Sequence, residues 1–297
     1  MKILVLLKTW PGGVGVAVKN YVREFEKQGH EVKTISRKED MGIYSLAKSI
    51  FPIRNKVKEL MKKNNYDIIY TKDWSLAFPL IFPYPLFKKK HYCGFGGLQN
   101  GTISKVLQKI VGRILGKRLI CYGDPVKKKF PNANKIFNGI NISSFKPLKG
   151  EKRIKNSVGF ANAPKDIYNF DKVKKAVEKS GKKFFHVWGK DPKTMPGFYN
   201  KIETFISIPP TYTGFNLCWL EAMACGVPKI IGSNSGIGNR LPIDKIENFK
   251  SIEEAILNSK RKNYRKLISK EFSWEVMAKK TINLWKKQEK NLSEKIV

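Results

Sequence analysis

Short apolar runs alternate with longer amphipathic segments along most of this chain. The run Lys2–Leu7 is followed by a glycine-rich loop, an amphipathic segment from about Val16 to Gln28, and a second predicted strand from Glu31 to Ile35, in which apolar and polar residues alternate. Such runs predict buried strands, and a 3.6-residue period predicts helices. The alternation is typical of an α/β protein with parallel sheets. By the same criteria we expect helices at 103–115 and 170–180 and strands at 67–70, 91–95, 118–122, 156–160, 183–188, 204–208 and 229–232.

Two segments in the first half combine apolar and basic residues. Residues 41–64 predict a pair of basic amphipathic helices around Pro52, with lysine and arginine opposite the apolar side. Residues 74–87 are apolar and aromatic, contain three prolines and end at Lys88-Lys89-Lys90. This second segment fits either a loop that inserts among lipid headgroups or a buried helix start followed by a loop.

The stretch from Ile208 to Ser233 carries the candidate site. Two prolines end a strand there, and turn-forming residues then precede an almost uniformly apolar helix from Phe215 to Ala224. A helix that is apolar on nearly every side indicates deep burial. Gly226 fits the position just after the helix, and Pro228 follows where a helix cannot continue.

One carboxylate, Glu221, interrupts this apolar helix. An unpaired buried carboxylate costs several kcal/mol, so the residue either faces solvent or caps a neighbouring turn, or it accepts hydrogen bonds from the hydroxyls of a ligand. The backbone N–H groups of Gly214, Phe215 and Asn216, at the helix start, suit a phosphate. A diphosphate at the helix start and a ribose on Glu221 would form one nucleotide site.

The same stretch resembles the donor-binding signature of the family-four retaining glycosyltransferases, which have the GT-B fold. The matching pattern is Pro210-x-x-Thr213-Gly214-Phe215-Asn216-x-x-x-x-Glu221-Ala222-Met223-Ala224-x-Gly226-x-Pro228. In that family two glutamates flank seven residues; the first contacts the donor sugar and the second the nucleotide ribose. Glu221 matches the second glutamate, whereas Thr213 stands in place of the first.

Further segments resemble the same family. The run Asn138-Gly139-Ile140-Asn141, followed by Phe145 and Pro147, is similar to the element at which the family's chain crosses between its domains. Residues 271–287 resemble its last helix, which returns to the first domain. Lys165 matches a lysine that grips the donor diphosphate.

Two further positions depart from the family pattern. Phe160 or Ala161 stands where the family usually carries an arginine for the diphosphate. Tyr70-Thr71-Lys72-Asp73 stands where it often carries a histidine motif. His91 begins a strand, so we expect a structural role for it.

The resemblance implies a GT-B fold, with two Rossmann-like α/β domains whose parallel sheets face a central cleft. Pro147, Gly150 and a lysine cluster mark a linker, so we place the domain boundary at about residue 148. The expected parts are an acceptor-side domain, a donor-binding domain, and a C-terminal helix that crosses back to the first domain. Their expected bounds are 1–148, 149–273 and 274–297.

The resemblance also implies transfer of a hexosyl group from a UDP- or GDP-sugar, with retention of configuration. Its residue assignments place Lys165 and Glu221 at the catalytic centre, with substrate contacts from Gly12, Gly13, Thr213, Gly214, Phe215, Asn216 and Leu217. Independently of the resemblance, we expect Met195 to lie beside the base. The Gly12-Gly13 pair either makes the first turn or lets backbone approach the cleft. No Asp-x-Asp occurs in the sequence, so we expect neither metal nor cofactor, and Lys165 and the helix start would neutralise the leaving diphosphate.

The length and the composition limit the classes of protein to which this chain can belong. The 297 residues suffice for two domains, and 41% hydrophobic content is that of a globular protein. The chain has four cysteines without Cys-x-x-Cys spacing, which indicates structural thiols in a reducing compartment. The opening apolar run is too short for a signal peptide, and no run has the length of a membrane span, so we expect a cytoplasmic protein.

The net charge of +34, mostly from lysine, admits two interpretations. The lysines are either solvated without a specific role, or they face an anionic partner such as lipid headgroups or nucleic acid. No zinc-ligand spacing, RNA-binding aromatic signature or helix-turn-helix punctuation accompanies the charge, so we expect no nucleic-acid partner. We favour peripheral attachment to the inner face of a membrane and a lipid-linked acceptor. The alternatives are a nucleic-acid-binding or nucleic-acid-modifying protein on a GT-B scaffold, and a non-catalytic nucleotide-sugar binder.

Overall fold

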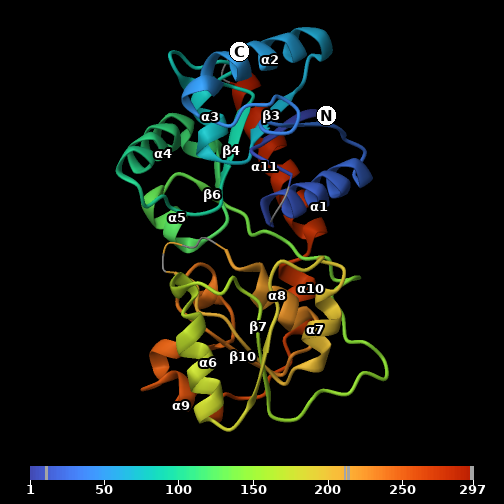
Figure 1. The fold of residues 1–297 in the computed structure, drawn as a ribbon. Helices are drawn as coiled ribbons and strands as arrows, with labels where there is room; N and C mark the ends of the chain where they lie inside the picture. The colour runs from blue at the N-terminus through green and yellow to red at the C-terminus, as the bar shows by residue number, and fades with distance from the viewer. Residues whose placement is uncertain (11–12, 211, 213–214, 295–297) are drawn as a thin grey trace. The chain divides into compact units, whose positions relative to one another are not determined.

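The computed structural model describes residues 1–10, 13–210, 212 and 215–294. The chain divides into two compact units, and each has its own parallel sheet (Figure 1). Each unit also has its own hydrophobic core. The first unit comprises Met1–Gly139 and Trp274–Val297, and the second comprises Ile140–Ser273.

The division lies before the boundary expected at about residue 148, because the segment after Gly139 packs within the second unit. The Ile140 N–H donates to the carbonyl of Phe272 at 2.7 Å. The Arg265 guanidinium donates to the carbonyl of Phe145 at 3.1 Å.

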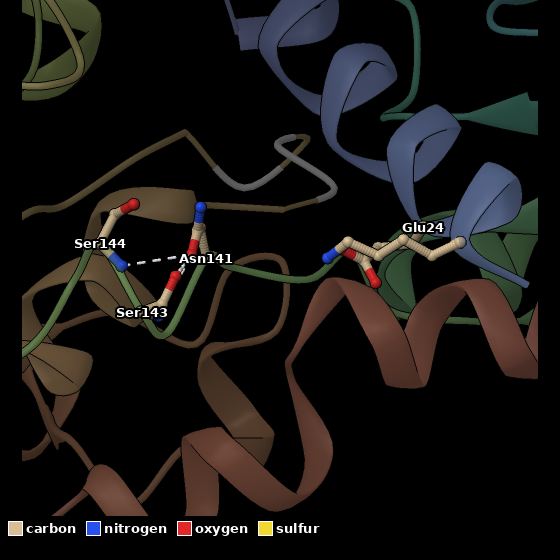
Figure 2. Close-up of polar contacts among 5 residues, drawn as sticks. Glu24, Asn141, Ser143 and Ser144 are labelled. Carbon is tan, nitrogen blue, oxygen red and sulfur yellow. Dashed lines mark hydrogen bonds and ion pairs between the residues drawn. The ribbon is translucent and has the colours of Figure 1, made fainter.

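The crossover segment is also held by a local turn. Figure 2 shows the Asn141 side-chain oxygen accepting hydrogen bonds from the Ser143 N–H (3.1 Å), the Ser143 hydroxyl (2.6 Å) and the Ser144 N–H (3.2 Å). Asparagine is favoured in such turns because its side chain can replace a backbone acceptor.

In the described part of the first unit, six parallel strands lie in the order β2-β1-β3-β4-β5-β6. Their bounds are β1 Lys2–Leu7, β2 Glu31–Ser36, β3 Ile68–Thr71, β4 His91–Phe95, β5 Leu119–Cys121 and β6 Asn134–Lys135. Strands β1, β3, β4 and β5 are almost wholly buried, which explains why they are continuous apolar runs in the sequence.

Helices cover both faces of this sheet. Their bounds are α1 Gly13–Lys27, α2 Ile50–Asn64, α3 Trp74–Ile81, α4 Thr102–Leu115, α5 Asp124–Lys129 and α11 Trp274–Ser293, with short 3₁₀ turns η1 Ala47–Ser49 and η2 Gly116–Arg118. Helix α1 packs against α11, whereas α2, α3 and α4 contact one another in series (Figure 1). This separation follows from right-handed crossovers that run in opposite directions from β1.

The expected helix pair in residues 41–64 is wrong. The structure has one helix, α2, preceded by the turn η1. Pro52 lies in the first turn of α2, where no backbone N–H has an intrahelical acceptor, so it does not divide the helix.

Residues 74–87 form a buried helix followed by an exposed loop, the second of the two alternatives. Helix α3 is capped by the Asp73 carboxylate, which accepts from the Ser75 N–H at 3.1 Å. The Arg54 guanidinium donates to three carbonyls of α3 and the loop, including that of Phe82 at 2.6 Å. Phe82 and Tyr84 remain exposed.

In the described part of the second unit, five parallel strands lie in the order β11-β10-β9-β7-β8. Their bounds are β7 Ser157–Phe160, β8 Lys183–His186, β9 Thr204–Ile206, β10 Lys229–Gly232 and β11 Asp244–Lys245. The helices are α6 Phe170–Lys179, α7 Met195–Lys201, α8 Leu217–Ala224, α9 Ile252–Asn258 and α10 Arg265–Glu271, and the 3₁₀ turns are η3 Asp166–Tyr168, η4 Gly238–Arg240 and η5 Ile246–Asn248. Helices α6 and α9 contact each other, and α8 contacts both α7 and α10.

Helix α11 completes the core of the first unit with one aromatic side chain. Trp285 is fully buried, and its ring centroid lies 5.4 Å from that of Phe25 on α1 and 5.4 Å from that of Tyr70 on β3. Tyr92 on β4 is a further neighbour, at 5.8 Å. The last described helix therefore packs against elements from the first hundred residues.

We expect Trp285→Ala to destabilise the first unit by about 3–5 kcal/mol, the range for emptying a large aromatic site in a core. Hydrogen exchange at the amides of β1 and β3, read by mass spectrometry, would report the loss. Trp188→Ala is the matched control, because Trp188 is 59% exposed. Unchanged protection in the Trp285 variant would contradict the inferred role of α11.

Candidate functional site

The second sheet has its topological switch point between β7 and β9. From β7 the chain passes to β8 on one side, then returns past β7 to form β9 on the other. In open parallel sheets, ligands bind in the crevice at the carboxyl ends of the strands that flank such a point. Asn162 lies just beyond β7 and Ser207 directly follows β9.

A chain of hydrogen-bonded polar side chains lies at this end of the strands. The Ser207 hydroxyl donates to the side-chain oxygen of Asn162 at 2.6 Å, and the Asn216 amide donates to the Ser207 hydroxyl at 2.8 Å. From the adjoining strand, His186 donates its Nε2–H to the Asn162 carbonyl at 3.0 Å. The sequence analysis did not predict Asn162, Ser207 and His186 as site residues. They lie close together because their strands are neighbours in the sheet, and the sequence does not show the strand order.

Asn216 also defines where α8 begins. Its side-chain oxygen accepts from the Cys218 N–H at 3.1 Å, so Asn216 is the N-cap and Leu217 the first helical residue. The helix therefore starts later than the sequence suggested, and the cap occupies one of its free N–H groups. Phe215 lies just before the cap and is partly buried, whereas Thr213 and Gly214 lie outside the described residues.

Helix α8 is fixed on the sheet by its apolar side chains. Trp219 and Met223 are fully buried, and the Trp219 indole N–H donates to the Ser207 carbonyl at 3.1 Å. Gly226 follows the helix with φ +72°, a left-handed conformation that glycine adopts without strain.

Glu221 lies in the middle of α8 and is only partly exposed. The Tyr199 hydroxyl donates to Glu221 Oε2 at 2.8 Å. Burial raises the pKa of Glu221 to about 7, although the Tyr199 hydrogen bond acts in the opposite direction. A carboxylate can accept about four hydrogen bonds, so Glu221 keeps capacity for ligand hydroxyls.

Tyr199 is a site residue that the sequence did not reveal. It belongs to α7, is fully buried, and packs its ring 5.4 Å from that of Phe205. Tyr199 and Glu221 are far apart in the sequence, so the sequence alone did not predict their hydrogen bond. Met195, the first residue of α7, is partly buried, and α7 packs against α8, so Met195 and Glu221 belong to neighbouring helices.

Lys165 follows β7 on the same edge of the sheet. It is exposed and directly precedes η3, and its ammonium group has no ion pair within the ranges that the structure describes. Phe160, at one of the two positions where the family's arginine would stand, is fully buried in the apolar core. Of the arginine and the lysine that the resembled family carries for the diphosphate, the described part of this chain therefore has the lysine, Lys165, after β7.

The other matched residues belong to the first unit. Gly12 lies outside the described residues, and Gly13 begins α1 with open space where a side chain would stand. The close backbone approach occurs at Gly15, where a Cβ would lie 1.7 Å from the carbonyl oxygen of Trp10.

Lysine occupies the place of the family's histidine motif. Lys72 is buried at the end of β3, with its Nζ 3.6 Å from the ring centroid of Tyr122. Burial lowers the pKa of Lys72 well below its usual value. His91 is buried too, with its Nε2 3.0 Å from the Thr71 hydroxyl, in the structural role expected for it.

The remaining candidate metal ligands and the cysteines form no second candidate site in the described ranges. No cluster of His, Cys, Asp and Glu side chains there could hold a metal ion. The four cysteines are free, and Cys93, Cys121 and Cys225 are buried. None of the described helices is long and apolar enough to cross a bilayer.

Comparison with known proteins identifies the fold. No protein-family model matches the chain, and no curated protein matches its sequence. A glycosyltransferase from Rickettsia africae shares the fold with TM-score 0.75 and 18% identity, covering 98% of this chain and 99% of that one. Sucrose-phosphate synthase from Thermosynechococcus elongatus matches with TM-score 0.73 and 14% identity, covering 96% and 98%. Anabaena HepE, in complex with UDP and glucose, matches with TM-score 0.64 and 12% identity, covering 95% and 98%. The expected GT-B fold of two parallel-sheet α/β domains is thus confirmed.

The raised pKa of Glu221 predicts a pH-dependent stability. The ordinary pKa is 4.5 and that in the folded protein about 7, so the folded state retains the proton between these values. The associated stability is complete below pH 4.5 and is lost as the pH rises through 7. Relative to Glu221→Gln, which keeps the acceptor for Tyr199, the wild type should lose about 3 kcal/mol over this range. Urea unfolding at several pH values would measure it, and a pH-independent difference would contradict it.

Proposed function

We propose that this chain transfers a hexosyl group from a nucleotide-sugar donor to an acceptor. The observation that carries the proposal is the partly exposed Glu221 carboxylate, oriented by Tyr199 on a helix that starts beside the switch point of the second sheet. A carboxylate there can accept from both ribose hydroxyls. The fold shared with glycosyltransferases supports the same reading of the site.

The donor diphosphate would lie between Lys165 and the start of α8. Lys165 is exposed and without an ion pair in the described ranges, and the helix dipole places partial positive charge at Leu217. Both groups would stabilise the negative charge that develops on the leaving diphosphate. We place the base beside Met195, and UDP is a suitable probe because HepE binds UDP.

We further propose that the transfer retains configuration and proceeds without a metal ion. Departure of the diphosphate with attack from the same face needs no protein general base. It needs positive charge at the leaving group, which Lys165 and the α8 start would supply without a cation from solution. The donor itself would be the co-substrate, and no further cofactor is required.

A non-catalytic nucleotide-sugar binder is the second candidate. The observation that favours it is the buried Phe160, which occupies a position where a second cation would assist the diphosphate. Donor hydrolysis without acceptor, measured with several UDP- and GDP-sugars, separates the two candidates. Release of nucleotide supports the transferase, and binding without release supports the binder.

For the acceptor, we propose a molecule held at an anionic membrane on its cytoplasmic face. The charge of +34 supports this location, as do the exposed Phe82 and Tyr84 in a loop that ends at three lysines. Each lysine near an anionic surface contributes about 1 kcal/mol, so a few suffice for peripheral attachment. Phe78, which lies in the same apolar and aromatic segment, packs instead against the core.

Above pH 7, where the Glu221 carboxyl is ionised, Glu221→Ala should weaken UDP or GDP binding by about 1.5–3 kcal/mol, the range for hydrogen bonds to a charged group. Titration calorimetry measures the change. Glu178→Ala, which removes an exposed carboxylate from α6 in the same unit, should leave the affinity unaltered. Equal affinities for all three proteins would exclude Glu221 from the nucleotide site.

Lys165→Ala should lower the rate of donor turnover by about a hundredfold and change KM much less, because the charge it stabilises develops in the transition state. Lys165→Arg should recover part of the rate. Lys172→Ala, at an exposed position on α6, serves as the control. Normal turnover in Lys165→Ala would mean that another cation neutralises the diphosphate.

A further inference from the structure

Helix α4 has an apolar face that the described residues of the first unit leave exposed. Ile103, Val106, Ile110 and Ile114 are 77%, 53%, 39% and 37% exposed. Their spacings of three, four and four residues place them in one row along a helix. Single exposed aliphatic residues are common on proteins, but a continuous row of four marks an interaction surface.

The opposite face of α4 already has its partners. Val111 is fully buried in the core of the first unit, and Gly112 lies so close to Phe130 that a Cβ would be 2.3 Å from the ring. The Gln108 amide donates to the Gly97 carbonyl at 2.8 Å. Helix α4 is therefore held in place, and the outer row is not a core face that awaits packing.

A row of cations runs beside the apolar row. Lys105, Lys109 and Arg113 are exposed and lie four residues apart, and Lys117 follows in η2. The sequence Thr102–Leu115 contains no acidic residue. The surface thus combines apolar side chains that can insert into a bilayer with cations that attract anionic headgroups, as do helices that lie in a membrane interface.

We propose that α4 docks on an anionic lipid bilayer, lying in the headgroup plane with its four aliphatic side chains inserted. This inference rests on the proposed function, since it names the element that would hold the enzyme at a membrane-bound acceptor. Fourteen residues at about 1.5 Å each span roughly 21 Å, so the helix lies on the bilayer and does not cross it.

Charge complementarity selects the bilayer over other occupants. A second copy of the chain would bring an identical row of cations to the surface, and like charges repel. Nucleic acid would pair with Lys105, Lys109 and Arg113 but would leave the aliphatic row in water. Anionic lipid satisfies both rows, because headgroups meet the cations while acyl chains receive the apolar side chains.

The test is co-sedimentation of the full chain with vesicles of phosphatidylcholine, alone or mixed with phosphatidylglycerol. The wild type should bind only the mixed vesicles, and added salt should weaken binding. Val106→Asn with Ile110→Asn should lower the partition coefficient by about tenfold or more. Lys105→Gln with Lys109→Gln should lower it by about fivefold per lysine.

Matched controls locate the effect on α4. Leu257→Asn removes an exposed aliphatic side chain from α9, and Lys172→Gln with Lys175→Gln removes two exposed lysines from α6. Both should bind vesicles as the wild type does. A Phe82→Ser, Tyr84→Ser variant that alone loses binding would assign docking to the loop after α3 and overturn the proposal for α4.

Two further results would also overturn it. One is equal binding of both vesicle types by the wild type and the asparagine variant. The other is a wild-type dimer in sedimentation velocity that the asparagine variant abolishes, since the occupant would then be a second copy. UDP calorimetry on the asparagine variant should give wild-type affinity. Vesicle binding needs no donor, so failure of the docking proposal and failure of the transferase proposal are distinguishable.

Discussion

The second unit depends on the burial of one short helix that carries a carboxylate. Helix α8 must be covered on nearly every side, yet Glu221 needs a polar partner, and α7 supplies it through Tyr199. Backbone groups at both ends of α8 also have hydrogen-bond partners. Asn216 caps the start, and at the other end Arg265 donates to the Ala224 carbonyl at 2.5 Å and Arg153 to the Cys225 carbonyl at 2.9 Å. Cations at a helix C-terminus also offset its dipole. A small reorientation of α8 would therefore disturb the site and the crossover together.

Much of the fold could be predicted from the sequence because parallel strands are buried on both faces. The run at β1 is apolar for that reason, and the β4 bounds agree with expectation to the residue. The expected helix break at Pro52 failed for a local reason, since proline is harmless in a first turn. Periodicity does not show which turn of a helix a proline will occupy.

The site was less predictable, because its partners meet only through topology. The motif around Glu221 gave the carboxylate and its helix, but Tyr199 comes from a segment that matched nothing in the family. Asn162 and Ser207 meet because β7 and β9 are neighbours in the sheet. The outer row of α4 was hidden for another reason: Ile110 and Val111 are equally apolar in sequence, and only the packing shows which one is covered.

Helix α11 has a consequence for the order in which the chain can fold during synthesis. Phe25, Tyr70 and Tyr92 leave the ribosome early, but Trp285, which packs among them, emerges after the whole second unit. The N-terminal domain usually folds first during synthesis. Here the core of the second unit can be complete before the core of the first unit. Until translation passes α11, the nascent first unit exposes an aromatic cavity. Chaperone demand should accordingly concentrate on the earliest part of the chain.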